Sequence, residues 1–282
     1  MISCSARKMI QFHIRDWLDL HRSYAKIHGG IEFEFEDIDY AFGVVEGFST
    51  LWGGRAQMAG HGDLELTKVD EYWLYDHNIG VKLPFTTKVF NDELYNKSLD
   101  ILKEYHRKGN AVITYHDDLG RRIKEDFPDY KIEASCIQDI NNIEKWNKKV
   151  SLGIYDEIVL PIHLNDDITF LNDIKEKELL RLFLNVECSY NCPQKVCYGV
   201  TSKINAGLQE QGTMLCSLLD FGMPRTFYND EIDWKTFYFD KQLFDGMGID
   251  KYKLVPPIEN AQRIPLMLEK NKDMRHGNKQ ND

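Results

Sequence analysis

The chain has 282 residues, of which 43% are hydrophobic and 28% are charged, so it can bury a sizeable core as a globular protein. Its formal net charge of −10 argues against broad electrostatic binding to nucleic acid or to an anionic membrane. No apolar run reaches the length of a membrane span, and the start of the chain lacks the apolar segment of a signal peptide. These features predict a cytoplasmic protein, in a compartment where thiols stay reduced.

The first 38 residues are expected to form an N-terminal extension that covers one end of the core. Within it, residues 9–20 are predicted to form a short helix, and the pair Gly29-Gly30 interrupts the chain after it. Residues 31–36 alternate between apolar and acidic side chains, which is typical of a half-exposed strand.

From residue 39 on, short apolar runs alternate with helix-like segments. The predicted strands cover 40–45, 79–85, 111–114, 130–134, 157–160 and 179–186, and a helical pattern follows each of the first five. Beyond residue 197 the pattern blurs, and 214–219 and 250–255 are the candidates for a seventh and an eighth strand, with a closing helix over 261–270.

Strand–helix alternation of this kind is typical of βα units and a parallel sheet. Because no glycine-rich phosphate-binding motif follows an early strand, an open doubly wound sheet is the weaker interpretation. We therefore expect an α/β fold, a TIM-like (β/α)8 barrel over residues 39–270 that is irregular in its last third. The polar residues 271–282 are expected to form a disordered tail.

Three of the six cysteines lie within ten residues, directly after the sixth predicted strand, at Cys188, Cys192 and Cys197. Thiolates are soft, charged ligands that bind iron or zinc, so this cluster predicts a metal site. The alternative is that these are buried thiols without a metal. The candidates for a fourth ligand are, in order of preference, Cys216, Cys136 and Cys4.

Several polar side chains follow predicted strands at the end where parallel barrels carry their chemistry. His116, His163 and Glu187 are the candidate catalytic residues, since an imidazole or a carboxylate there can act as an acid or a base. Asn185 and Arg55 are the candidate substrate-binding residues, and the Arg55 guanidinium can grip a carboxylate or phosphate with two hydrogen bonds. A structural hydrogen-bonding role for each histidine, and pairing of Arg55 with a barrel carboxylate such as Glu46, are the alternatives.

The pattern Asn185-x-x-Cys188-x-x-x-Cys192-Pro193, placed after a run of βα units, resembles the collagenase-like peptidase family, peptidase family U32. The segment from Gly248 to Leu254 also resembles the closing strand of that family. The resemblance implies a TIM-like barrel, a four-cysteine iron–sulfur cluster of the 4Fe–4S type, and hydroxylation of RNA bases or quinone precursors. Two departures affect substrate and activity more than fold: Pro256-Pro257 stand where related sequences often carry an arginine, and Cys197-Tyr198 stand where many carry His-Tyr.

The first functional hypothesis is therefore an iron–sulfur barrel enzyme for redox or oxygen-insertion chemistry on a small molecule or RNA. The second is a non-catalytic protein of the same fold, with zinc or no metal, that acts as a scaffold or a partner of another protein. The third, a peptidase, rests on the family name alone. No membrane or DNA partner is indicated.

Overall fold

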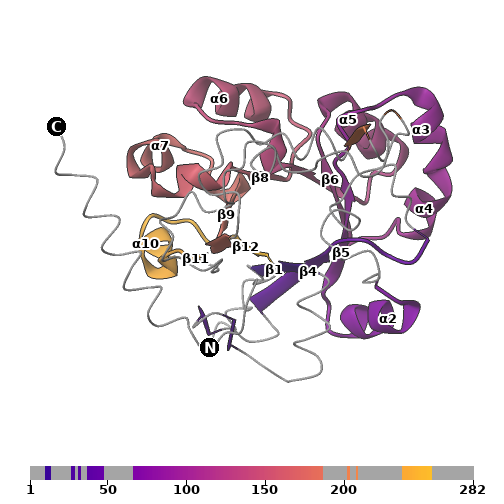
Figure 1. Ribbon diagram of the computed structural model, residues 1–282, viewed down its shortest axis with the longest axis horizontal. Coiled ribbons are helices and arrows are strands. Elements are labelled where there is room, and N and C mark those ends of the chain that lie inside the picture. Colours follow the sequence, from indigo (N-terminus) through magenta and orange to yellow (C-terminus); the bar gives the residue numbers. More distant parts are fainter. Residues whose placement is uncertain are drawn as a thin grey trace, which may run out of the picture.

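The computed structural model describes residues 10–13, 27–28, 31–32, 37–47, 66–186, 202–203, 208 and 237–255. Within these residues, eight strands close into a barrel, and every neighbouring pair is parallel. Figure 1 views the ring with the helices around its outside, which confirms the expected TIM-like barrel. In ring order the strands are β1 (Ile10–His13), β12 (Tyr252–Leu254), β9 (Leu180–Phe183), β8 (Glu157–Val159), β7 (Lys131–Ala134), β6 (Ala111–Thr114), β5 (Gly80–Phe85) and β4 (Ile38–Phe42).

The barrel begins earlier in the chain than the sequence predicts. Residues 10–13 were expected to lie in a helix of the N-terminal extension, but they form β1, which pairs with β12 on one side and β4 on the other. Without β1, the strands β12 and β4 would each keep an edge with unpaired backbone groups. The pairing of β1 with both strands closes the ring and removes these edges. The expected extension over residues 1–38 is therefore wrong in this part.

The described strands fill all eight places of the barrel, and residues 214–219 are not among them. That candidate seventh strand, the predicted closing helix over 261–270 and the predicted tail over 271–282 lie outside the described residues. The candidate strand at 250–255 is confirmed as β12.

Helices follow the strands as predicted, and several begin at a side chain that accepts a backbone hydrogen bond. Asn91 caps α3 by accepting from the Leu94 N–H at 2.8 Å, and Thr67 and Asp70 form a capping box at the start of α2. The helices are α2 (Lys68–Asp76), α3 (Asp92–Lys97), α4 (Leu99–Glu104), α5 (Asp117–Asp126), α6 (Ile143–Ser151), α7 (Ile168–Asp173) and α10 (Lys241–Gly246), with short 3-10 turns η3 (Cys136–Gln138), η4 (Ile162–Asp166) and η5 (Lys177–Leu179).

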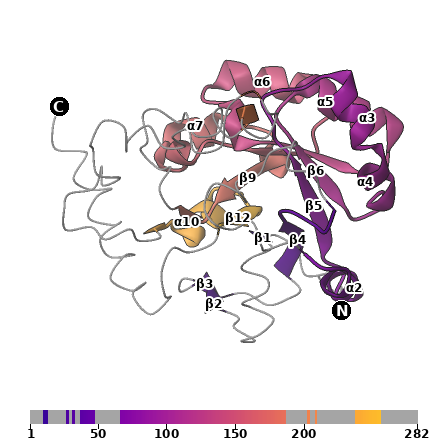
Figure 2. The same ribbon diagram turned by 45° about the vertical axis from the view of Figure 1, so that its right-hand side comes forward.

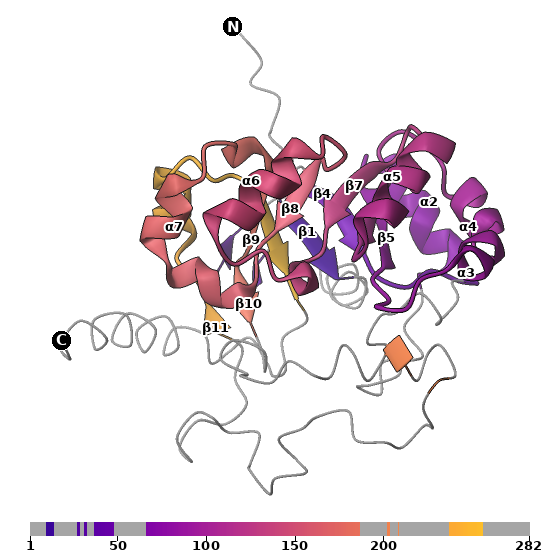
Figure 3. The ribbon, with the colours of Figure 1, turned by 90° about the horizontal axis from the view of Figure 1, so that it is seen from above.

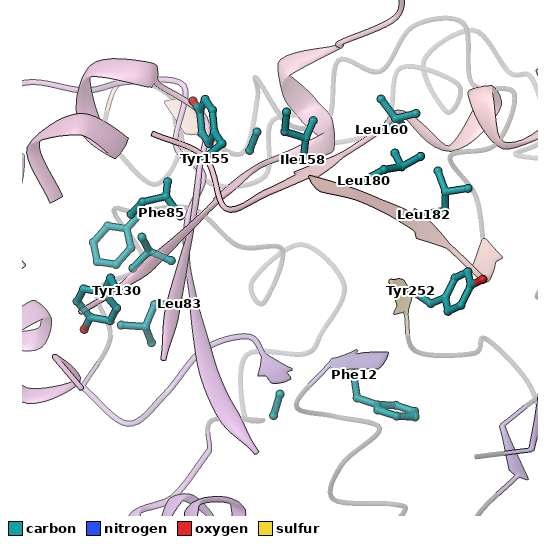
Figure 4. Packing of buried hydrophobic residues seen from close by; sticks show 14 of the residues in the cluster. Phe12, Leu83, Phe85, Tyr130, Tyr155, Ile158, Leu160, Leu180, Leu182 and Tyr252 are labelled. Atoms are coloured by element: carbon teal, nitrogen blue, oxygen red, sulfur yellow. The ribbon is translucent and has the colours of Figure 1, made fainter. Parts of the chain in front are cut away.

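The main apolar core lies between the barrel and its helices. Alternate residues of each strand point outward into it, for example Leu83 and Phe85 from β5 and Leu180 and Leu182 from β9, and all four are fully buried (Figure 4). The other residues of these strands must then point into the barrel, because side chains alternate across a strand.

Two short pairs lie outside the ring. β10 (Asn185–Val186) follows β9 and pairs antiparallel with β11 (Phe237–Tyr238), and Figure 3 shows this pair projecting from one end of the barrel. β2 (Ile27–His28) and β3 (Ile31–Glu32) form a separate antiparallel pair (Figure 2). Because β10 directly follows β9, the β10–β11 pair lies at the end of the barrel where the parallel strands finish. We call this end the carboxyl rim.

Candidate functional site

The inner face of the barrel carries charged side chains where parallel barrels usually carry branched apolar ones. Lys82 and Lys253 lie in the middle of otherwise apolar strands, and the contacts of these charged side chains cross the barrel. Lys82 of β5 binds Glu133 of β7 at 2.7 Å and Glu157 of β8 at 2.6 Å, and neither strand is a neighbour of β5. Lys253 of β12 likewise reaches Glu133 at 3.0 Å.

These groups form one continuous series of alternating charge, which we call the interior charge chain: Asp39, Arg181, Glu157, Lys82, Glu133 and Lys253. Arg181 binds both oxygens of Glu157, through Nε at 3.0 Å and Nη2 at 2.9 Å, and it also contacts Asp39. Three acids face three bases, so the series is electrically balanced. That balance sets each buried charge beside a group of opposite charge, which offsets the cost of burying it.

Asp39 enters this series through an irregularity in β4. Along the β1–β4 pairing, Ile10 lies opposite Ile38 and the next residue, Gln11, lies opposite Tyr40. Asp39 is therefore the extra residue of a β-bulge, which re-aims a side chain that would otherwise face the helices.

The pKa values of Glu157 and Glu133 reflect their ion pairs, whereas burial raises the pKa of Asp39 despite the neighbouring charge of Arg181. Burial by itself raises the pKa of Glu157, but Arg181 and Lys82 outweigh it and hold that pKa well below its ordinary range. Burial also opposes ionisation of Glu133, and the charges of Lys253 and Lys82 bring its pKa below the ordinary value. Both carboxyl groups are therefore ionised acceptors at neutral pH.

At the carboxyl rim, His116 directly precedes α5 and follows β6. Its Nε2 is buried and has no hydrogen-bond partner within the described part of the chain, and its ring packs against Tyr115 and Phe90, with centroids 4.8 and 5.5 Å away. Burial lowers the pKa of His116, partly offset by hydrogen bonds to the backbone of Lys88 and Thr87. The ring is thus neutral at pH 7 and held from one side, which leaves the Nε2 lone pair for a proton or a ligand.

The other candidates within the described part of the chain have distinct surroundings. His163 lies in the first turn of η4 after β8, and Cys136 opens η3 after β7, so both stand on the same rim as His116. Asn185 is different, because its side-chain amide donates to the Val255 carbonyl at 2.7 Å and accepts from the Val255 N–H at 2.8 Å. This pair of bonds ties the start of β10 to the residue after β12 and gives Asn185 a structural role.

Both ends of the cysteine segment are placed at the carboxyl rim. Val186 belongs to β10 after β9, and the Ser202 hydroxyl accepts from the Lys88 N–H at 3.0 Å just after β5. In the ring, β9 and β5 lie on opposite sides. The segment that carries three cysteines therefore starts and finishes on opposite sides of the same end of the barrel.

The remaining predicted site residues lie outside the described residues: Arg55, Glu187, Cys188, Cys192, Cys197, Cys216 and Cys4. Within the described residues, no three His, Cys, Asp or Glu side chains are grouped to hold a metal ion. No helix in this same part of the chain is long and apolar enough to cross a membrane. The donor set for a metal thus stays a prediction from the cysteine spacing.

The sequence motifs described above do not predict the interior charge chain. Its signal is a single charged residue at the centre of an apolar strand, as in Val81-Lys82-Leu83, Leu180-Arg181-Leu182 and Tyr252-Lys253-Leu254. Such a residue cannot face the apolar layer under the helices, so it indicates a polar barrel interior.

A search of solved structures finds the same fold in the U32 peptidase Mk0906, with a TM-score of 0.58. The match covers 92% of this chain and 96% of the other, at 12% sequence identity. No protein-family model and no curated protein matches the sequence. The resemblance expected from the sequence is therefore supported at the level of the fold, because likeness at this identity speaks to architecture and not to activity.

Proposed function

We propose that this chain is a divergent relative of the U32 peptidases that acts as a cytoplasmic enzyme with a substrate site at the carboxyl rim. The proposed chemistry is redox or oxygen insertion on a small molecule or RNA. An iron–sulfur cluster, held by Cys188, Cys192 and Cys197 with Cys216 as the fourth ligand, would supply electron transfer when bound.

The observation that carries this proposal is the position of the two described residues that flank the cysteine segment. Its two placed ends, Val186 and Ser202, lie at the rim where His116 and His163 also stand. Ends of different strands bring residues that are distant in sequence within reach of one ligand, whereas the opposite end of a barrel mainly serves stability. The thiolates, as soft donors, fit iron, and Cys136 on η3 is the alternative fourth ligand on the same rim.

His116 is the residue whose surroundings fit a chemical role best. Its neutral ring and its Nε2, which has no partner among the described residues, suit a base that takes a proton from the substrate, or an acceptor that holds a substrate O–H group. His163 is proposed to assist from β8, two strands away around the rim. Glu187 and Arg55 remain candidates from the sequence, as a second acid–base group and as an anion-binding side chain.

The test is metal analysis of protein purified without oxygen, together with its visible absorption spectrum. We expect bound iron in the wild type and its loss in Cys192→Ser, with Ser189→Ala in the same segment as the control that keeps iron. Comparing Cys216→Ser with Cys136→Ser identifies the fourth ligand. Full iron content in Cys192→Ser would refute the assignment.

A second candidate function is peptide-bond hydrolysis, which the name of the structural neighbour favours. Peptidase activity in metal-free protein, lost in His116→Ala, would place this candidate ahead. Bound zinc without any activity would instead favour a non-catalytic scaffold of the same fold.

A further inference from the structure

The interior charge chain ends in a lysine that has fewer partners than the one at its centre. The Lys82 ammonium has three acceptors, Gln11 at 2.7 Å, Glu133 and Glu157, which equals its number of N–H groups. Among the described residues, Lys253 hydrogen-bonds a single acceptor, the Glu133 Oε1 at 3.0 Å. Lys82 is therefore saturated, and Lys253 keeps donor capacity.

A second group with unused donor capacity lies beside Lys253. Gln11 is fully buried, and its Nε2 has no hydrogen-bond partner among the residues that the structure describes. Its orientation is fixed, because exchanging the amide oxygen and nitrogen would point an N–H at the Lys82 ammonium. Gln11 and Lys253 are paired residues on the adjacent strands β1 and β12, and both point into the barrel.

Lys253 is also the charge that stands nearest to the carboxyl rim. Its ammonium lies 4.2 Å from the ring centroid of Phe42 and 5.8 Å from that of Phe183, which are the last residues of β4 and β9. Its side chain is 8% exposed, whereas those of Lys82 and Arg181 are fully covered. At the other end of the series, Asp39 lies near the start of β4.

We propose that Lys253 and Gln11 form an anion-binding floor beneath the carboxyl rim, which holds a carboxylate or phosphate group of the substrate. The ammonium supplies the charge and Gln11 a neutral N–H, and a negatively charged oxygen would accept from the unused N–H groups of Lys253 and from the Gln11 amide. Phe42 and Phe183 line the approach with apolar surface, which strengthens a charge-assisted bond by excluding water. This inference rests on the proposed placement of the substrate at this rim and names its chemical class.

The experiment is calorimetric titration of the protein with inorganic phosphate and, separately, with acetate, at constant ionic strength set by chloride. We expect saturable binding of at least one of the two anions. The anion that binds more tightly indicates whether the substrate group is a phosphate or a carboxylate. Lys253→Met should weaken it about tenfold or more, since a charge-assisted hydrogen bond is lost. Lys131→Met, at the exposed start of β7, is the charge-matched control and should bind as the wild type does.

Gln11→Glu is the second variant, because it keeps the oxygen that Lys82 needs and replaces the free N–H by a carboxylate oxygen. It should abolish anion binding while the protein stays folded, so the test survives if Lys253→Met does not fold. Absence of binding of both anions to the wild type, or wild-type affinity in Gln11→Glu, would overturn the proposal. Neither outcome depends on bound metal. Failure of this inference can therefore be distinguished from failure of the proposed function, which is tested by iron content.

Discussion

Arg181 is the residue on which the interior charge chain depends most. Its guanidinium is fully buried, binds Glu157 twice, contacts Asp39 and donates to the Tyr252 carbonyl at 2.7 Å. Arg181→Met keeps much of the side-chain volume and removes the charge and all of these donors. The variant therefore tests whether the ion pairs in the barrel are needed for folding.

The two carboxylates would respond differently to this change. Glu157 would keep Lys82 at 2.6 Å, but Asp39 would lose its ion-pair partner while its side chain is only 11% exposed. Breaking a buried ion pair from one side costs about 3–5 kcal/mol, because the other charge stays buried without compensation. Against a total stability of roughly 5–15 kcal/mol, this is a large fraction.

Urea unfolding followed by circular dichroism measures the effect. Arg181→Met should lose about 3–5 kcal/mol of unfolding free energy, and adding Asp39→Asn should recover part of it, with a coupling of about 0.5–3 kcal/mol. Lys241→Met is the surface control, since its i,i+4 pair with Asp245 is part exposed and its loss should change stability by no more than about 0.5 kcal/mol. A loss under about 1 kcal/mol in Arg181→Met, or strict additivity in the double variant, would refute the reasoning.

Three further outcomes are expected. Burial lowers the pKa of His116 in the folded protein. The stability contributed by its neutral form is therefore present above about pH 6.5 and is lost as the pH falls through the lower folded-state pKa. His116→Gln should flatten the dependence of the unfolding free energy on pH in this range. Asn185→Ala leaves the Val255 N–H and carbonyl without their partners and should cost about 1–3 kcal/mol in urea unfolding, with unchanged phosphate affinity. Gly80→Ala places a Cβ 2.0 Å from the Gly109 carbonyl oxygen. The variant should therefore lose at least about 1–3 kcal/mol of stability, which is measured as a lower melting temperature.

Much of the architecture follows from local pattern. The strand at Ala111–Thr114 is predicted and found with the same bounds, and the helix expected after Asn91 starts where that side chain caps it, although it divides into α3 and α4. Apolar side chains at alternate positions and polar caps act over a few residues, so they can be read without knowing the fold. The parallel order of six strands then places His116 and His163 on one rim.

The tertiary structure alone decides what closes the barrel and what fills it. Four residues at Ile10–His13 are too short a pattern to separate strand from helix, and only the open edges of β12 and β4 select β1. Similarly, the sequence marks Lys82, Arg181 and Lys253 as charges within apolar strands but not their partners. Arg181 and Glu157 lie on the neighbouring strands β9 and β8, but the other ion pairs join strands that are not neighbours in the ring, so those pairs exist only once the ring has closed and its interior excludes water.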